Sequence, residues 1–67
     1  MFPNDILDSR RTALGITIKR LAERTGLNYE LTRRGMNGTR QFTATEFIRI
    51  CNALGLTLAD FDERLVF

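Results

Sequence analysis

The chain has 67 residues, enough for one compact domain around one hydrophobic core, and we expect residues 1–67 to form that domain. With 43% hydrophobic and 27% charged residues, the composition is that of a folded protein and excludes a disordered tail. A single cysteine, Cys51, excludes a network of internal disulfides, and the absence of histidine removes the usual zinc sites. The common catalytic schemes therefore lack their residues, and we expect no enzyme, no metal and no cofactor.

The apolar residues are scattered in short runs. None approaches the roughly 18 residues that span a bilayer, and the N-terminus lacks the pattern of a secretory signal. We therefore expect a cytoplasmic protein. Because so short a chain has a marginal core, a second copy that adds buried area is a reasonable expectation.

Basic residues are concentrated in one part of the chain. Residues 10–40 hold eight basic and two acidic side chains, a local net charge of +6, whereas the remainder carries −4. Nine of the ten cations are arginine, which can donate two parallel hydrogen bonds to a phosphate or a guanine. This distribution favours a nucleic-acid-binding surface, although a solvated helix face would give a similar count.

The first two predicted helices are short and bounded by polar caps and glycines. The first covers residues 5–14, with Asn4 as its N-cap and Gly15 as its end. The second begins after the cap Thr17 and ends at Gly26. Its narrow apolar stripe has the spacing i, i+3, i+4: Ile18, Leu21 and Ala22.

Three further helices are predicted towards the C-terminus. Asn28 caps the third, over residues 29–36, which the turn Asn37-Gly38 closes. A T-x-x-E capping box at Thr43 precedes the fourth, at about 44–54, and a T-x-x-D pattern opens a fifth at about 58–65. The fourth has an apolar face, in which the thiol is expected to be a buried small hydrophobe: Phe47, Ile48, Ile50, Cys51 and Leu54. No segment alternates like a strand, so we predict an all-α fold of five helices.

Only three residues separate the second helix from the third, which suits the steep crossing of a helix-turn-helix at about residues 17–36. Ala22 is small where the helices cross, Gly26 permits the positive φ of the turn, and Leu27 fills the angle. From Thr17 to Phe61, about two-thirds of the chain, the sequence resembles the lambda-repressor-like family of phage repressors, Cro proteins and bacterial regulators. The matching positions are Leu21, Ala22, Gly26, Leu27, Asn28, Asn37, Gly38, Arg40, Ala53, Leu54, Gly55, Leu56, Thr57 and Leu58.

Two positions of the third helix depart from the family pattern. Thr32 and Gly35 stand where the family places branched apolar residues facing the core. A glycine inside a helix costs about 1 kcal/mol and contributes no side chain to the core. Leu31 and Met36 are the apolar residues available to compensate, so we expect a third helix that is rotated, shortened or loosely packed.

The resemblance implies that the third helix enters the major groove of DNA. The expected base contacts are Tyr29, Glu30, Arg33 and Arg34. Among them, Arg34 matches the position that reaches inward, where it can bind O6 and N7 of guanine. Glu30 can accept from N4 of cytosine or, alternatively, pair with Arg33 or Arg34 along the helix.

Contacts to the DNA backbone are expected from the start of the second helix and the loop after the third. They are Arg11, Thr17, Lys19, Asn28, Asn37, Thr39 and Arg40. Alternatively, Asn37-Gly38 is only a turn and Arg11 a surface cation. Arg20 and Arg24 are expected to be solvated or paired with Glu23.

The apolar C-terminus is expected to form a twofold dimer patch, with Met1 and Phe2 as further candidates. The patch comprises Phe61, Leu65, Val66 and Phe67. The alternative is that these residues close the core over the first helix.

We therefore expect a DNA-binding transcription regulator that occupies an operator in double-stranded DNA as a homodimer. With no room for a sensor domain, a Cro-like repressor of a phage or bacterium fits best, acting in the bacterial or host cytoplasm. The alternative is a protein-interaction module on the same fold, such as an antitoxin or antirepressor, with a protein as its partner.

Overall fold

The computed structural model describes residues 3–57 and 59–61. They form four α-helices, α1 (Pro3–Ala13), α2 (Ile18–Thr25), α3 (Tyr29–Met36) and α4 (Ala44–Leu54), and one turn of 3-10 helix at residues 59–61. This part of the chain contains no strand, which confirms the all-α prediction. Of the fifth helix, predicted at 58–65, the structure describes only this turn, and residues 58 and 62–65 lie outside the described ones.

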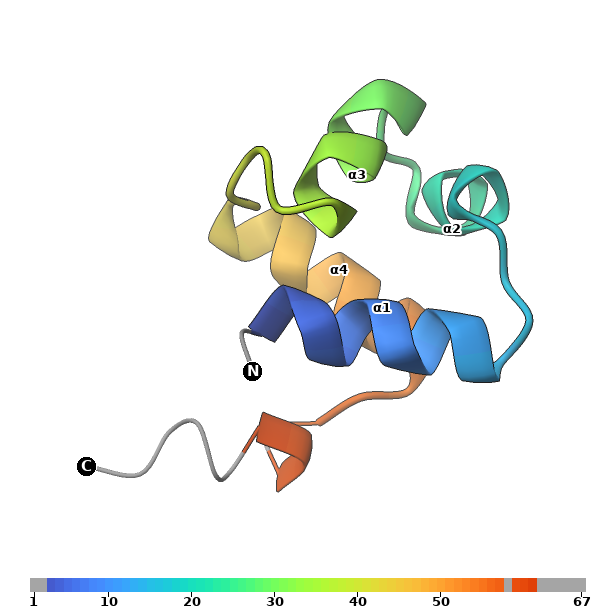
Figure 1. Cartoon of the computed structure of the whole chain (residues 1–67), viewed down its shortest axis with the longest axis vertical. Coiled ribbons are helices and arrows are strands. Elements are labelled where there is room, and N and C mark those ends of the chain that lie inside the picture. Colours follow the sequence, from blue (N-terminus) through green and yellow to red (C-terminus); the bar gives the residue numbers. More distant parts are fainter. Residues whose placement is uncertain (1–2, 58, 62–67) are drawn as a thin grey trace.

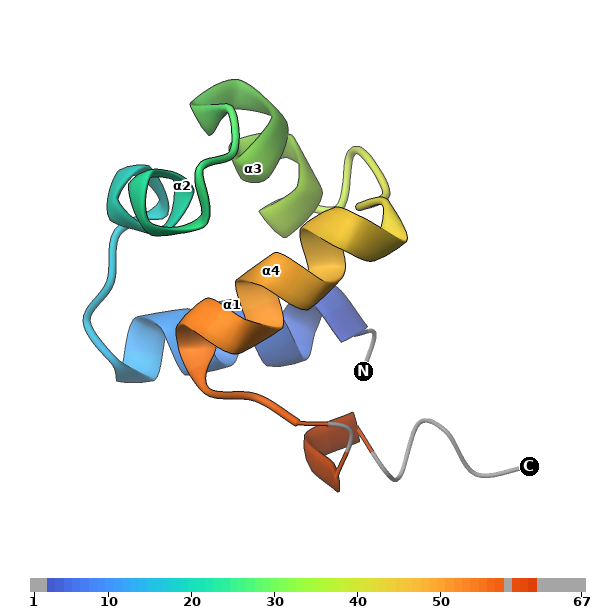
Figure 2. The ribbon, with the colours of Figure 1, turned by 180° about the vertical axis from the view of Figure 1, so that it is seen from behind.

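The helices are arranged in two levels around one core (Figure 1). α1 and α4 cross at the base, while α2 and α3 lie above them, and the view from behind shows the same order (Figure 2). The core is apolar and draws on each of the four helices and the segments that follow α1 and α4. Its buried members are Leu7, Ile16, Leu21, Met36, Ile50, Leu54, Leu56 and Phe61.

Polar caps start three of the helices, as the sequence predicts. The side chains of Thr17, Asn28 and Thr43 each accept a hydrogen bond from the backbone N–H three residues on. At α4 the Glu46 carboxylate also accepts from the N–H of Thr43, at 2.8 Å, which completes the predicted capping box. These caps satisfy N–H groups that the first turn of a helix leaves without partners.

The predicted start of α1 is wrong by two residues. The helix begins at Pro3, so Asn4 lies within its first turn and is not the N-cap. Proline suits the first position of a helix because its φ is already helical and its missing N–H would have no partner there. At the other end, the helix stops at Ala13 and Gly15 follows in a turn.

The turn between α2 and α3 has the predicted geometry. Gly26 has a φ of +71°, in the left-handed region that favours glycine. The next N–H, that of Leu27, bonds to the carbonyl of Ala22 at 3.1 Å and closes the end of α2. Leu27 packs against the core and Ala22 is buried, so both residues lie where the sequence places them.

The expectation of a rotated, shortened or loosely packed α3 is wrong. The helix spans Tyr29–Met36 and turns Thr32, Gly35 and Met36 inward. The ring of Phe42 fills the space beside Gly35, so that a methyl group on this glycine would overlap it. Thr32 is only 1% exposed, and its hydroxyl donates to the Asn28 carbonyl at 2.8 Å. The space that a larger side chain at Gly35 would fill is thus taken by the Phe42 ring, from the loop that follows the helix.

An ion pair holds the loop between α3 and α4. The Nη2 of Arg40 donates to Oε2 of Glu46 at 3.1 Å, and Nη1 lies 3.1 Å from Oε1 without hydrogen-bond geometry. Glu46 therefore joins the loop to the N-terminus of α4. Arg40 and the backbone N–H of Thr43 hold the pKa of this carboxyl below its ordinary value.

The structure corrects the predicted dimer patch at Phe61. It is 4% exposed and packs on Phe47 of α4, with ring centroids 5.4 Å apart. Because so little of its surface remains uncovered, it belongs to the core of its own chain, as the alternative interpretation has it. Leu65, Val66, Phe67, Met1 and Phe2 lie outside the described residues.

The packing of Gly35 on Phe42 predicts that Gly35→Ala destabilises the protein. Although alanine is the better helix former by about 1 kcal/mol, the overlap with the ring should cost about 1–3 kcal/mol. Urea unfolding followed by circular dichroism measures this difference. In a Phe42→Leu background the same substitution should cost less, since the shorter side chain leaves room for the methyl group. Equal costs in the two backgrounds would contradict the packing.

The Arg40–Glu46 pair predicts a pH-dependent contribution to stability. Because the pKa of Glu46 is lowered on folding, its contribution is present above its ordinary value of about 4.5 and is lost as the pH falls below it. Glu46→Gln should therefore reduce the free energy of unfolding by about 1 kcal/mol at pH 7 and by nearly nothing at pH 3.

Thr43→Ala is the matched control. It removes the hydroxyl that caps α4 but leaves the carboxylate, so its loss of about 1 kcal/mol should persist at both pH values. A Glu46→Gln loss that did not shrink at low pH would rule out the ion pair as its cause.

Candidate nucleic-acid interface

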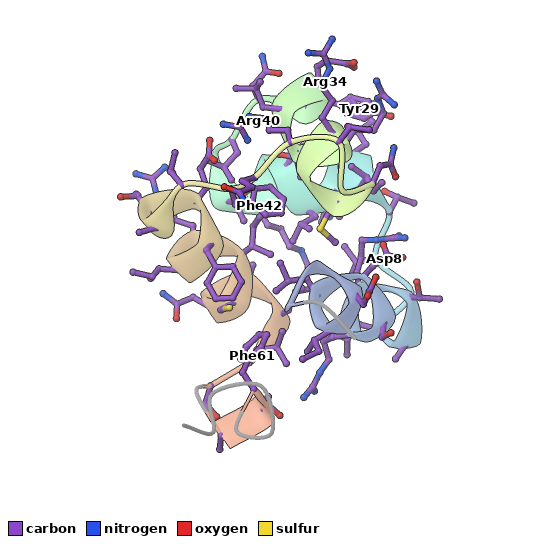
Figure 3. All side chains as sticks on the ribbon, turned by 60° about the vertical axis from the view of Figure 1, so that its left-hand side comes forward. Asp8, Tyr29, Arg34, Arg40, Phe42 and Phe61 are labelled. Atoms are coloured by element: carbon purple, nitrogen blue, oxygen red, sulfur yellow. The ribbon has the colours of Figure 1, made fainter. Side chains whose placement is uncertain are left out.

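The outer face of α3 carries the candidate recognition residues. At 3.6 residues per turn, Glu30 and Arg34 lie opposite the buried side of the helix, flanked by Tyr29, Leu31 and Arg33. Tyr29 and Leu31 are 47% and 39% exposed, and the side chain of Arg34 is 55% exposed. Figure 3 shows Tyr29, Arg34 and Arg40 at one end of the molecule, with Phe61 at the opposite end.

Glu30 pairs with both arginines of this face. The Nε of Arg33 donates to Oε2 at 3.2 Å and its Nη2 donates to Oε1. A longer contact of 3.5 Å joins Nε of Arg34 to Oε1. The hydrogen bond from Arg33 lowers the pKa of Glu30 and raises that of Arg33, so both partners of this bond are charged at neutral pH. The alternative interpretation of Glu30, as a partner of the arginines, is confirmed.

Polar groups at the starts of α2 and α3 retain free hydrogen-bonding capacity. The Oγ of Thr17 accepts from the N–H of Arg20, and Oδ1 of Asn28 accepts from that of Leu31, both at 3.1 Å. These bonds use acceptors, so the Thr17 hydroxyl hydrogen and the Asn28 amide remain available as donors. Lys19 is exposed on the first turn of α2. All three can donate to an anion such as a phosphate.

The loop after α3 offers fewer free side-chain donors for a phosphate than the sequence predicts. The hydroxyl of Thr39 donates to the Arg34 carbonyl at 3.1 Å, so its hydrogen is already used to close the helix. Arg40 is held by Glu46 and its side chain is only 25% exposed. Asn37 is exposed at the C-cap of α3. Thr39 is exposed as well, but its hydroxyl hydrogen is engaged, so Asn37 is the better candidate in this loop for donating to a phosphate.

Arg11 has a structural role in this fold. Its Nε and Nη2 donate to Oδ1 of Asp8 at 3.0 and 2.8 Å, and its Nη1 donates to the Ile16 carbonyl at 2.7 Å. The guanidinium thus ties the end of α1 to the segment before α2. It is neither the free surface cation of the alternative interpretation nor fully available to a phosphate.

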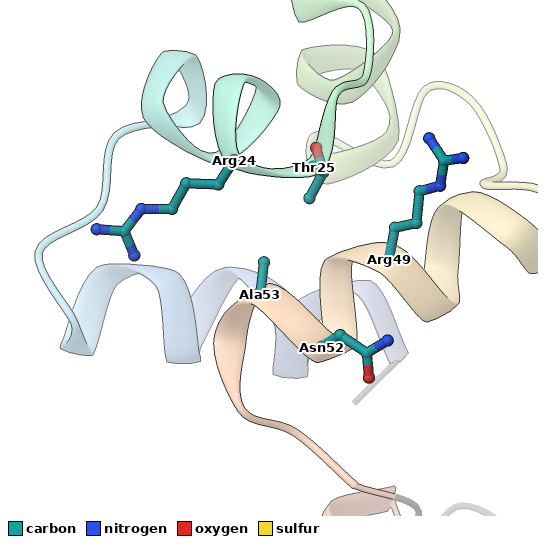
Figure 4. Close-up of a pocket in the computed structure, with 5 residues that line it drawn as sticks. All are labelled: Arg24, Thr25, Arg49, Asn52 and Ala53. Carbon is teal, nitrogen blue, oxygen red and sulfur yellow. The ribbon is translucent and has the colours of Figure 1, made fainter.

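The shallow depression between α2 and α4 offers no convergent groups. It has a volume of about 410 Å³ and is lined by Arg24, Thr25, Arg49, Asn52 and Ala53. Its two arginines point away from each other (Figure 4). Arg20, Glu23 and Arg24 are exposed, and no ion pair among the described side chains joins Glu23 to either arginine.

Residues 3–57 and 59–61 also contain no group of three or more acidic or cysteine side chains placed to hold a metal. No helix there is long and apolar enough to cross a membrane. The thiol of Cys51 is half-buried, and burial, followed by the charge of Asp60, raises its pKa and makes it a poor nucleophile.

Sequence reasoning missed two residues that position this face. Phe42 stands in a loop without periodicity, and no local pattern pairs it with a glycine seven residues earlier. Glu46 is visible as a capping-box residue, but its second partner, Arg40, becomes apparent only in three dimensions.

The comparisons with known proteins agree with this architecture. The family model described as a Cro/C1-type HTH DNA-binding domain matches residues 7–64, which includes all of α2, α3 and α4. No curated protein and no solved structure gives a significant match. With the helix-turn-helix geometry at α2 and α3, this match shows that the chain belongs to the Cro/C1-type HTH family of DNA-binding domains.

Proposed function

We propose that the protein is a sequence-specific transcription regulator that binds double-stranded DNA, and that it acts as a Cro-like repressor by occupying an operator. The single observation that carries the proposal is the outer face of α3. The helix is capped, complete and packed on its inner side, while its outer side carries two arginines, a tyrosine and a carboxylate. A rigid helix with polar side chains on one face suits insertion into the major groove.

In this proposal α3 faces the base edges and the adjacent helix starts face the phosphates. The residues on the face that is turned towards the bases are Tyr29, Glu30, Arg33 and Arg34. The phosphate contacts are the residues that keep exposed groups or free donors: Thr17, Lys19, Asn28 and Asn37. Thr39, Arg40 and Arg11 are engaged within the chain and would act on DNA mainly by holding these groups in place.

A compromised α3 would matter less to a protein-interaction module, the alternative function, than to a DNA-binding protein. Since Phe42 fills the space beside Gly35 and Thr32 is buried with its hydroxyl bonded, that argument no longer applies. We therefore propose DNA as the partner, with action in the cytoplasm of a bacterium or of a phage-infected cell.

The proposal predicts different effects for a base contact and a phosphate contact. Arg34→Ala should weaken binding to a duplex selected from a random pool by about 1–3 kcal/mol and relax the preference at one base pair. Lys19→Ala should weaken all duplexes alike and reduce the slope of log K against log salt by about one. Titrations at several salt concentrations measure both effects.

Two outcomes would count against this proposal. If selection enriches no sequence, the protein is not a sequence-specific regulator. If Arg34→Ala leaves the base preference intact, α3 docks in a different register.

We also propose that the protein binds its operator as a homodimer through the apolar C-terminal residues Leu65, Val66 and Phe67. Sedimentation at micromolar concentration, with and without a selected duplex, should then show two chains per duplex. The selected sequence should be palindromic, with half-sites one helical turn apart. Replacing the three residues by serine should reduce assembly, whereas a strict monomer in both states would rule out the dimer.

A further inference from the structure

The carboxylate of Glu30 contacts the two neighbouring arginines unequally. It faces the Nε–Nη2 edge of Arg33 with both oxygens, one at 3.2 Å from Nε and the other bonded to Nη2. Its contact with Arg34 is longer, 3.5 Å between Nε and one oxygen. The two arginines therefore differ in how firmly they are held.

This difference decides which guanidinium is free. Two parallel N–H bonds hold the plane of Arg33 against the carboxylate, the geometry in which arginine and carboxylate pair most strongly. Among the described residues, no hydrogen bond joins the terminal nitrogens of Arg34 to Glu30, and the side chain of Arg34 is more exposed than that of Arg33, 55% against 40%. A bidentate contact with guanine requires such a pair of free N–H groups.

The carboxylate also lies in the middle of the outer face. A negative charge there repels phosphates and the acceptor atoms O6 and N7 of purines, so it reduces affinity for a duplex that places these groups beside it. This reduction in affinity is smallest for a duplex that places a guanine beside the N–H groups of Arg34 that Glu30 does not bind. An unfavourable group of this kind increases discrimination at the expense of general affinity.

We propose that Glu30 is a positioning residue that determines specificity: it holds Arg33 away from the bases and leaves Arg34 as the guanine reader. This inference rests on the proposed function. It assigns different tasks to residues that the sequence treats as equivalent base contacts. Arg33 then orients the carboxylate and contributes positive charge, while Arg34 provides the base contact.

The test compares Glu30→Gln with Glu23→Gln in the full chain. Both substitutions remove one exposed negative charge, but Glu23 lies on α2, outside this face. Affinities are measured for the selected duplex and for a scrambled duplex of equal length at one salt concentration. Glu23→Gln should raise both affinities alike, because both duplexes carry the same phosphates. Glu30→Gln should raise the affinity for the scrambled duplex more and lower the ratio of the two about tenfold.

A third variant shows whether Glu30 acts through Arg33. In an Arg33→Ala background no second guanidinium competes for the base, so Glu30→Gln should change the ratio much less than in the wild type. An unchanged ratio in Glu30→Gln, or the same change with and without Arg33, would overturn the inference. The proposed function would stand in either case, as long as selection enriches a sequence.

A measurement without DNA separates the two proposals further. The Nε–H of Arg33, bonded to the carboxylate, should exchange more slowly in NMR spectra than that of Arg34, and Glu30→Gln should remove the difference. Equal exchange in the wild type would overturn the positioning role while leaving the DNA-binding proposal intact. Failure of selection to enrich any sequence would overturn both.

Discussion

The contact between Gly35 and Phe42 is the constraint on which the proposed recognition face, the outer side of α3, depends. Helix α3 has only eight residues, so it cannot be stable alone and must be fixed by packing its inner side. The family pattern places a branched side chain there, whereas this chain uses a glycine and fills the space with a ring from the following loop. The ring and the Arg40–Glu46 pair together connect α3 to α4, and they set how the outer face of α3 is presented.

Charge on this protein is partly neutralised by the fold. The basic region from residue 10 to residue 40 has a formal net charge of +6, but four of its arginines donate hydrogen bonds to carboxylates: Arg10 to Asp60, Arg11 to Asp8, Arg33 to Glu30 and Arg40 to Glu46. The pair of Arg33 and Glu30 lies on the proposed recognition face, whereas the other three lie outside that face. A count of basic residues therefore overstates the charge that the chain offers to a polyanion.

Local sequence determined the helices and their ends. Thr17, Asn28 and Thr43 cap their helices, and Gly26 ends α2, because capping and left-handed turns depend on residues within about four positions of each other. The bounds of α3 and α4 agree with the prediction for the same reason. The helix-turn-helix was equally predictable, since three residues between two capped helices leave few ways to pack them.

Tertiary structure decided which of the candidate side chains are free. The sequence presents Arg11, Arg33, Arg34 and Arg40 as similar cations, and it leaves open whether Phe61 lies inside the chain or at a dimer interface. Only the folded chain brings Glu46 to Arg40, the Ile16 carbonyl to Arg11, and Phe47 to Phe61. These partners lie on different helices or loops, so no local pattern joins them. The sequence thus identifies the candidate arginines, and the tertiary structure decides which of their guanidinium groups are free.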